Sequence, residues 1–328
     1  MTPAVPARRA FIGAALGLAA GGAAAASLHW HERSLVALGT TLRLRLAAGS
    51  AAQASAALGA AVAAVRRVEA AMSLFRPDSE LVRLNREGRL ESPSADLRTV
   101  LQAALRVARR SGGAFDPTVQ PLWHAYEAAH LRGRLPNAAE LRAARQAVGW
   151  RGVRLRADAV VLRPGMALTL NGIAQGHAAD AAREALGAHG IAHALLDCGE
   201  TAAWGRSPRG DAWTLAIEDP RDPTRALTAL RCDGRAVATS ADHRSTFSPD
   251  RRHHHILDPA TGDSPPALSS VTVLAPSAMQ ADALTKVMFI AGPARIAVLA
   301  HAWGVGVLWV DKAGRWQATP DLRLAAVG

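Results

Sequence analysis

The chain has 328 residues, of which 49% are hydrophobic, and this content excludes a disordered protein because it supplies enough apolar side chains for a core. The net charge is +11, yet the basic residues are spread along the chain and nearly all are arginine, the only lysines being Lys286 and Lys312. Nucleic-acid binding normally needs clustered basic residues, so the charge suits an anionic ligand or membrane surface and argues against nucleic acid.

The first 26 residues are typical of a secretory signal. The basic pair Arg8-Arg9 precedes an apolar stretch over 11–20, and small residues follow at Ala24-Ala25-Ala26. The pair and its neighbours resemble a twin-arginine signal, which exports proteins that are already folded. The apolar stretch is too short and too rich in Ala and Gly for a membrane span. The sequence therefore predicts a signal over 1–26, an exported periplasmic protein, and one domain over 27–328.

Apolar periodicity and turn residues predict an α+β protein in which strands and helices do not alternate regularly. In chain order the predicted elements are a strand in the second half of 33–49, a helix over 51–71, a short helix ending at Asn85 and capped by Asp78 or Ser79, a helix over 95–110, a hairpin around Ala157-Asp158, a helix containing Ala178 to Leu186, short strands over 192–273, helices over 277–291 and 294–302, and a strand over 305–310. No repeat or long linker divides the chain. Whether Cys198 and Cys232 form a disulfide stays open at this level.

A loop poor in side chains precedes the helix that contains Ala178. Gly172, Ala174 and Gly176 fall within five positions, directly after an apolar run that reaches Asn171. Glycine permits close approach of another group to the backbone, and a helix N-terminus offers N–H groups to an anion. Tight packing explains the same pattern equally well, so the loop alone does not decide between a binding role and a structural one.

Four further segments carry polar residues that chemistry can use, and each also has a structural explanation. Asp258 to Gly262 has the composition of a turn, and Asp116 is suited to cap the segment that begins at Pro117. Asp282 stands alone on an otherwise apolar helix face, and local capping or pairing is its structural explanation. The three histidines at 253–255 make a poor metal site, because neighbours on a strand point to opposite faces.

Taken in order, these segments resemble the ApbE family of FAD:protein FMN transferases, and the resemblance covers nearly all of the predicted mature chain. The motifs are MSLFRPDSELVRLN (72–85), GGAFDPTVQPLW (112–123), LNGIAQGHAAD (170–180), AVATSADHRSTF (236–247), HILDPATG (255–262) and SVTVLAPSAMQADALTKVMF (270–289). The family resemblance implies a single T-fold-like unit with antiparallel sheets and packed helices, without the regular alternation of a doubly wound parallel sheet.

The same resemblance implies the chemistry. Enzymes of this family cleave the pyrophosphate of FAD, attach FMN to a Thr or Ser hydroxyl of a target protein and release AMP, usually with Mg²⁺. The implied acceptor is an exported or membrane-associated redox protein. By position in the motifs, the implied metal ligands are Ala174 and Asp282, the implied catalytic residues are His255 and Asp258, and the implied flavin contacts are Met72, Phe75, Ala114, Phe115, Asp116, Asn171 and His177. Thr285, one place before the position of the family's Thr, is added as a candidate metal ligand, and Lys286 as a candidate catalytic residue.

Two positions depart from the family pattern. Gln175 stands where Lys is common, and Lys286 stands four residues after Asp282, where the family has a Thr at the metal. Residues four apart on a helix share a face, so Lys286 is expected to pair with Asp282 or to neutralise phosphate directly. Two alternatives to FMN transfer therefore remain: hydrolysis of FAD to FMN and AMP, or flavin binding without catalysis.

Overall fold

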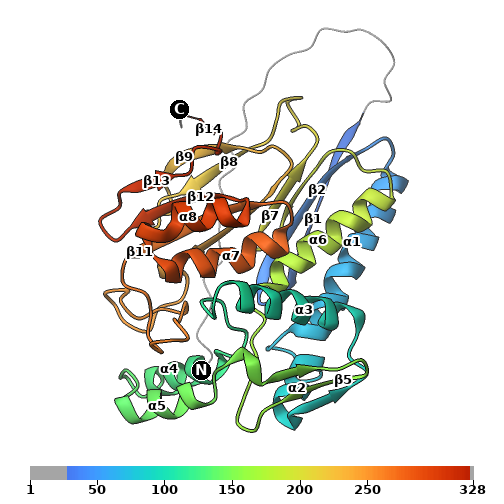
Figure 1. Ribbon diagram of the computed structural model, residues 1–328. Helices are drawn as coiled ribbons and strands as arrows, with labels where there is room; N and C mark the ends of the chain where they lie inside the picture. The colour runs from blue at the N-terminus through green and yellow to red at the C-terminus, as the bar shows by residue number, and fades with distance from the viewer. Residues whose placement is uncertain (1–27, 326–328) are drawn as a thin grey trace.

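An eight-stranded antiparallel sheet forms the centre of the computed structural model, which describes residues 28–325 (Figure 1). In spatial order its strands are β1 (His29–Ala37), β2 (Thr40–Ala48), β6 (Ala194–Asp197), β7 (Thr201–Trp204), β10 (Ala236–Ala241), β11 (Leu268–Ala275), β12 (Gly306–Asp311) and β13 (Trp316–Ala318). Every pair of neighbouring strands in this sheet runs antiparallel. The predicted α+β architecture with antiparallel sheets is therefore confirmed. The predicted signal lies outside the described residues.

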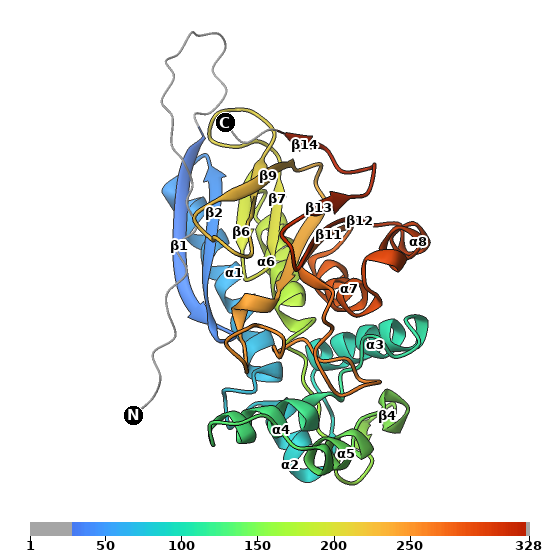
Figure 2. The same ribbon diagram turned by 90° about the vertical axis from the view of Figure 1, so that its left-hand side faces the viewer.

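Helices cover one face of the central sheet, as the two views show together (Figures 1 and 2). This layer contains α1 (Ala51–Met72), α6 (Ala174–Ala188), α7 (Ala278–Ala291) and α8 (Pro293–Trp303). Successive side chains of the buried strand β11 point to opposite faces. Val273 accordingly packs in the core under the helices, whereas Leu274 joins Leu308 in a second core on the other face. That face is covered by a three-stranded sheet of β14 (Leu324–Ala325), β9 (Ala226–Arg231) and β8 (Thr214–Glu218).

The remaining elements lie at one end of the central sheet (Figure 1). They are α2 (Glu80–Glu87), α3 (Ala95–Arg110), α4 (Gln120–His130), α5 (Ala138–Gln146) and a small sheet of β3 (Arg89–Glu91), β5 (Ala159–Leu162) and β4 (Val153–Leu155). A third apolar cluster, made by Leu122, Tyr126, Phe247 and Leu257, joins α4 to the loop after β10. This contact brings the motifs near Asp116 and His255 into one region.

Most predicted helices form where the sequence places them. Helix α3 spans the predicted residues, and α1 and α7 each differ from their predicted ranges by one residue at one end. Serine hydroxyls accept backbone N–H groups at several helix starts, and at α2 the cap is Ser79 and not Asp78. The hairpin around Ala157-Asp158 is β4 and β5.

The sequence did not indicate β1, α4, α5, β13 or β14. Helix α5 buries none of its residues, so it has no apolar stripe from which it could be recognised. Strand β1 lies at the sheet edge, where it pairs only with β2 and is mostly exposed or half-buried, so its apolar alternation is weak.

Two other open points concern the cysteines and membrane spans. Cys198 and Cys232 are both free thiols, and burial raises the pKa of Cys198 to about 12, so this thiol is unreactive at neutral pH. Within residues 28–325, no helix combines the length and the apolar character that crossing a membrane requires.

Candidate active site

The loop before α6 meets other segments closely enough to require its glycines. A Cβ atom on Gly176 would lie 2.3 Å from the carbonyl oxygen of Ala278, so α6 and α7 reach their present contact only with glycine there. At Gly172 a Cβ would lie 3.1 Å from Cε of Lys286 and 3.5 Å from the Phe115 ring. Both explanations of this loop therefore hold: Gly176 serves packing, and Gly172 lets two predicted site residues approach the backbone.

Asp282 and Lys286 form an ion pair on α7, facing this loop. Asp282 is fully buried, and its Oδ1 is contacted by the ammonium of Lys286. Lys286 also donates to the carbonyl oxygen of Asp282 at 3.1 Å, and the backbone N–H of Gly176 lies 3.3 Å from Oδ2 of the carboxylate. The ammonium thus neutralises the carboxylate beside the α6 N-terminus.

Thr285 lies on the same helix but its hydroxyl is engaged elsewhere. It donates to the carbonyl oxygen of Asp282 at 2.7 Å and lies 2.7 Å from the Ser240 hydroxyl. Residues 28–325 contain no group of three or more His, Cys, Asp or Glu side chains arranged to hold a metal ion. Asp282 is the only charged ligand predicted for Mg²⁺, and its carboxylate is already paired with the Lys286 ammonium. The residues in this arrangement therefore do not fit a Mg²⁺ site.

A narrow pocket opens next to this loop. Its lining residues come from the β1–β2 turn, the end of α1 and the start of α6: Leu38, Met72, Ser73, Phe75, Asn171, Ala174 and Gln175. Three predicted flavin contacts, Met72, Phe75 and Asn171, therefore lie together. The Phe75 side chain is 72% exposed and packs across Gly39, which presents a flat apolar face to a planar ligand.

The segment Ala114–Asp116 contributes to both sides of the site. The Phe115 side chain is buried beside Gly172. The Asp116 carboxylate accepts hydrogen bonds from the Thr118 N–H at 2.8 Å, the Thr118 hydroxyl at 2.6 Å and the Trp150 N–H at 2.9 Å. Burial raises the pKa of Asp116, and these hydrogen bonds oppose that rise only in part. Asp116 thus shapes the turn before α4, as the structural explanation predicted.

An open cavity of about 500 Å³ is lined in part by Asp116. Its wall includes Arg142, Arg145 and Arg151, together with Pro259 and Ala260 from the HILDPATG motif. Arg145 donates to the carbonyl oxygen of Ala260, and the Arg151 guanidinium stacks 4.5 Å from the centre of the Trp150 ring. The cavity is therefore basic and borders a predicted catalytic segment.

His255 is held at the base of a short hairpin. Its backbone N–H donates to the carbonyl oxygen of Ser245 at 3.0 Å, and its Nδ1 lies 3.2 Å from the same oxygen. A carbonyl oxygen only accepts, so Nδ1 carries a proton, and when the ring is neutral Nε2 has the lone pair that a base requires. Asp258 closes the following turn by accepting the Ala260 N–H at 2.8 Å.

His177, another predicted flavin contact, lies apart from Met72, Phe75 and Asn171. Its Nε2 lies 2.9 Å from Oδ1 of Asp96, and the other oxygen of that carboxylate, Oδ2, accepts a hydrogen bond from Arg67 of α1 at 3.3 Å. The ring therefore joins α6 to α3 and is absent from the lining of the pocket.

Sequence reasoning did not identify Leu38 and Ser73 as pocket residues. Leu38 adopts φ of 51°, which is unusual for a residue other than glycine, and its N–H donates at 2.9 Å to the buried Glu69. The only local signal was Gly39 after Leu38, which is typical of any hairpin turn.

Comparison with known proteins places this chain in a family. The sequence model of the ApbE family matches residues 38–309. Proteins named FAD:protein FMN transferase are similar, including one from Treponema pallidum (30% identity over 319 residues, 89% of this chain and 87% of that protein) and one from Vibrio cholerae (32% over 251 residues, 74% and 75%). The fold matches the crystal structure of the ApbE protein from Thermotoga maritima (TM-score 0.81, 26% identity, 89% of this chain and 97% of that one) and the flavin transferase ApbE from Vibrio cholerae (TM-score 0.76, 27% identity, 92% and 97%). The chain therefore belongs to the ApbE family.

Proposed function

We propose that this protein transfers FMN from FAD to a Thr or Ser hydroxyl of an acceptor protein. The hydroxyl oxygen forms a bond to the phosphorus of the FMN half, the pyrophosphate P–O bond breaks, and AMP leaves with the bridging oxygen. The hydroxyl proton must pass to a base. The naming of the relatives supports the reaction, and the site supports it independently.

The observation that carries the proposal is that a pocket containing Phe75 and a half-buried cation meet at one loop. Phe75, Met72 and Asn171 line the pocket, and Lys286 contacts the same loop at Gly172. The pocket itself is only about 10 Å³, so the planar ring of a flavin would stack on the exposed Phe75 at its mouth, with its phosphates toward the cation. An ammonium has three N–H groups, and the contacts to Asp282 use two of them, which leaves one for a phosphate oxygen.

His255 is the proposed base. The hydrogen bond from Nδ1 to the Ser245 carbonyl fixes both the tautomer and the direction of the ring. Asp258 supports it through the turn that follows. A neutral histidine held in this way can accept the proton of the attacking hydroxyl.

Mg²⁺ enters this proposal as a competitor of Lys286 for the Asp282 carboxylate. The family resemblance predicts the ion, which supplies charge neutralisation at phosphates when it is bound. In the wild-type chain the Lys286 ammonium fills that role, and FMN transfer is expected to tolerate a chelator. Replacement of Lys286 by Thr is expected to restore the need for Mg²⁺.

The test uses the purified protein, FAD and candidate acceptor proteins encoded near it, with intact-protein mass spectrometry of the acceptor and chromatography of AMP. The proposal expects an FMN adduct on the acceptor together with AMP, and much slower formation of both, at a measurable residual rate, in His255→Ala. AMP without an adduct would indicate FAD hydrolysis, and FAD binding without AMP would indicate a flavin carrier. Either result overturns the proposal.

The partners and location follow from the same reasoning. The acceptor is a redox protein at or beyond the membrane, because the N-terminal segment resembles an export signal. The mature protein is expected to begin near Ser27 in the periplasm. N-terminal sequencing of protein from the native host tests this, and an intact Met1 on the soluble cytoplasmic protein would contradict it.

A further inference from the structure

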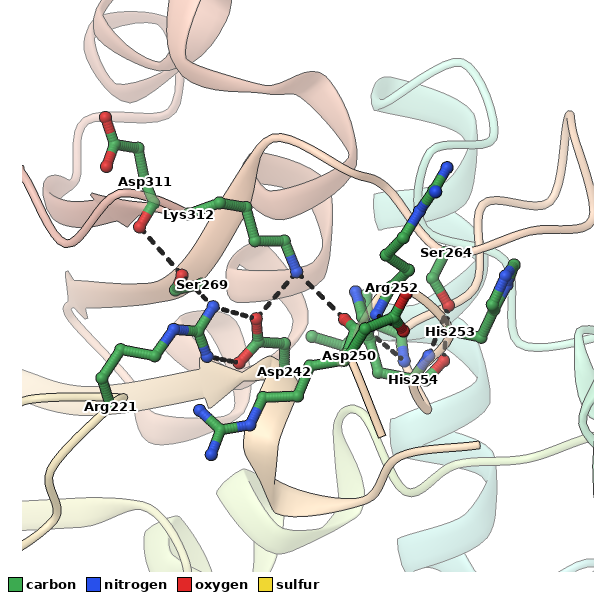
Figure 3. Close-up of polar contacts among 12 residues, drawn as sticks. Arg221, Asp242, Asp250, Arg252, His253, His254, Ser264, Ser269, Asp311 and Lys312 are labelled. Atoms are coloured by element: carbon green, nitrogen blue, oxygen red, sulfur yellow. Dashed lines mark hydrogen bonds and ion pairs between the residues drawn. The ribbon is translucent and has the colours of Figure 1, made fainter. Parts of the chain in front are cut away.

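Both lysines of this chain form ion pairs with fully buried aspartates. Lys286 pairs with Asp282 at the proposed phosphate site, and Lys312 pairs with Asp242 directly after β10. The second pair lies outside the proposed flavin pocket. Figure 3 shows the Lys312 ammonium between the Asp242 carboxylate and the chain segment near Arg252.

The Asp242 carboxylate has two cationic partners, although one is enough to balance its negative charge. Arg221 binds both carboxylate oxygens at 2.8 Å, and Lys312 adds a third contact at 2.7 Å (Figure 3). Burial by itself raises the pKa of Asp242, but the bonds from Arg221 and Lys312 outweigh it and the net pKa is lowered. The bidentate Arg221 contact already compensates the buried charge, so Lys312 is available for a further role.

The other partner of Lys312 identifies that role. Its Nζ donates at 3.2 Å to the carbonyl oxygen of Arg251, which lies in the hairpin that ends at His255. Arg251 has φ of 59°, a left-handed conformation that needs support from its surroundings. The ammonium therefore ties the turn of the hairpin to the buried carboxylate at its base.

The hairpin itself is short and has few backbone contacts. Thr246 and His254 form an isolated antiparallel bridge, and the Phe247 N–H donates to the His253 carbonyl oxygen at 2.8 Å. Ser264 holds the other edge through the backbone of His254, at 2.8 and 2.7 Å. Ser264 and Lys312 thus hold two edges of the hairpin, in addition to the packing of Phe247 against Tyr126.

We infer that Lys312 is a positioning residue, which acts through the Asp242–Arg251 bridge to fix the hairpin that presents His255. This inference rests on the proposed function of His255. Lys312→Met keeps the aliphatic length and leaves Asp242 paired with Arg221, so the variant is expected to fold. It should lower kcat by about tenfold to a hundredfold, as small misplacements of catalytic groups do, with an unchanged KM for FAD.

The decisive test is a double-mutant cycle. In the His255→Ala background, Lys312→Met should cause no further loss of kcat, because its effect passes through the missing ring. Lys312→Arg, which can reach both acceptors with its several N–H groups, should recover most of the lost rate. Arg315→Met is the matched control: the Arg315 side chain is 82% exposed in the same β12–β13 turn and pairs only with Asp311 in the described contacts, so kcat should not change.

Hydrogen exchange provides a readout that does not depend on activity. In Lys312→Met the amides of Phe247 and His255 should exchange faster, while those of the β10–β11 ladder keep their protection. Equal loss of kcat in the wild-type and His255→Ala backgrounds, or hairpin amides that exchange as in the wild type, would overturn the inference. If no FMN transfer occurs at all, the proposed function fails, and the exchange result still decides whether Lys312 holds the hairpin.

Discussion

At the scale of single residues, Phe75 is the most exposed member of the proposed flavin pocket. Because Phe75 is 72% exposed, Phe75→Ala should leave stability nearly unchanged. A stacked aromatic contact contributes about 1–3 kcal/mol, so the Kd for FAD should rise roughly tenfold or more in a flavin fluorescence titration. Leu131→Ala removes another exposed apolar side chain, 82% exposed at the end of α4, and should not change the Kd. Equal affinities for the wild type and Phe75→Ala would exclude stacking on this ring.

A second residue-scale prediction separates the roles of Lys286 and Mg²⁺. Lys286→Thr leaves the buried Asp282 carboxylate without its cation, which should cost at the low end of ~3–5 kcal/mol because the Lys286 side chain is 21% exposed. Mg²⁺ that binds the freed carboxylate should then raise the melting temperature of the variant, but not that of the wild type. Thermal unfolding with Mg²⁺ or with EDTA measures this without any enzyme assay. A melting temperature that does not respond to Mg²⁺ in Lys286→Thr would show that Asp282 does not bind the ion.

At the scale of secondary-structure elements, the contact between α6 and α7 depends on one glycine. Gly176→Ala places a methyl group 2.3 Å from the Ala278 carbonyl oxygen, so the helices must separate, at a cost of about 1–3 kcal/mol. Gly187 lies in the same helix with no atom within 4 Å of its Cβ position. Gly187→Ala should therefore stabilise α6 by about 0.5–1 kcal/mol through helix propensity alone. Urea unfolding of both variants checks the opposite signs, and a stabilised Gly176→Ala would refute the packing role.

At the scale of the whole molecule, two histidines should make the free energy of unfolding depend on pH: His254, which is fully buried, and His243, which is half-buried. Burial is the main cause that lowers the pKa of His243 and of His254 to about 4. In the unfolded chain these histidines have a pKa of about 6.5, so between pH about 6.5 and about 4 the unfolded state binds protons that the folded state does not. The contribution of these rings to the free energy of unfolding is therefore fully present above this pH window. It falls as the pH is lowered through the window, by at most about 1.4 kcal/mol per pH unit for each ring.

His243→Phe tests this pH dependence. Neither ring nitrogen of His243 has a hydrogen-bond partner within the described part of the chain, so a phenyl ring can replace it without breaking a bond. Urea unfolding at neutral and at mildly acidic pH should give a smaller loss of stability in the variant than in the wild type. Identical pH dependence in both proteins would mean that His243 does not contribute.

The sequence by itself predicted the family and most of the helices of this protein, but few of the contacts between distant residues. Serine caps, glycine stops and apolar stripes are local signals, and they predicted α1, α3 and α7 nearly to the residue. The ordered motifs predicted the family, and with it the antiparallel architecture. The pairing of Lys286 with Asp282 was also predictable, because helix geometry alone places residues four apart on one face.

The tertiary structure decided which distant residues meet. Lys312 lies 70 residues from Asp242, His177 lies 81 residues from Asp96, and both contacts depend on how strands and helices pack. From the sequence, Gly172 and Gly176 could each serve either tight packing or ligand approach. The contacts of α7 and Phe115 with the loop distinguished the two glycines. Short-range patterns record the conformation of neighbouring residues, whereas sheet register and helix contacts bring remote side chains together and carry no local signal.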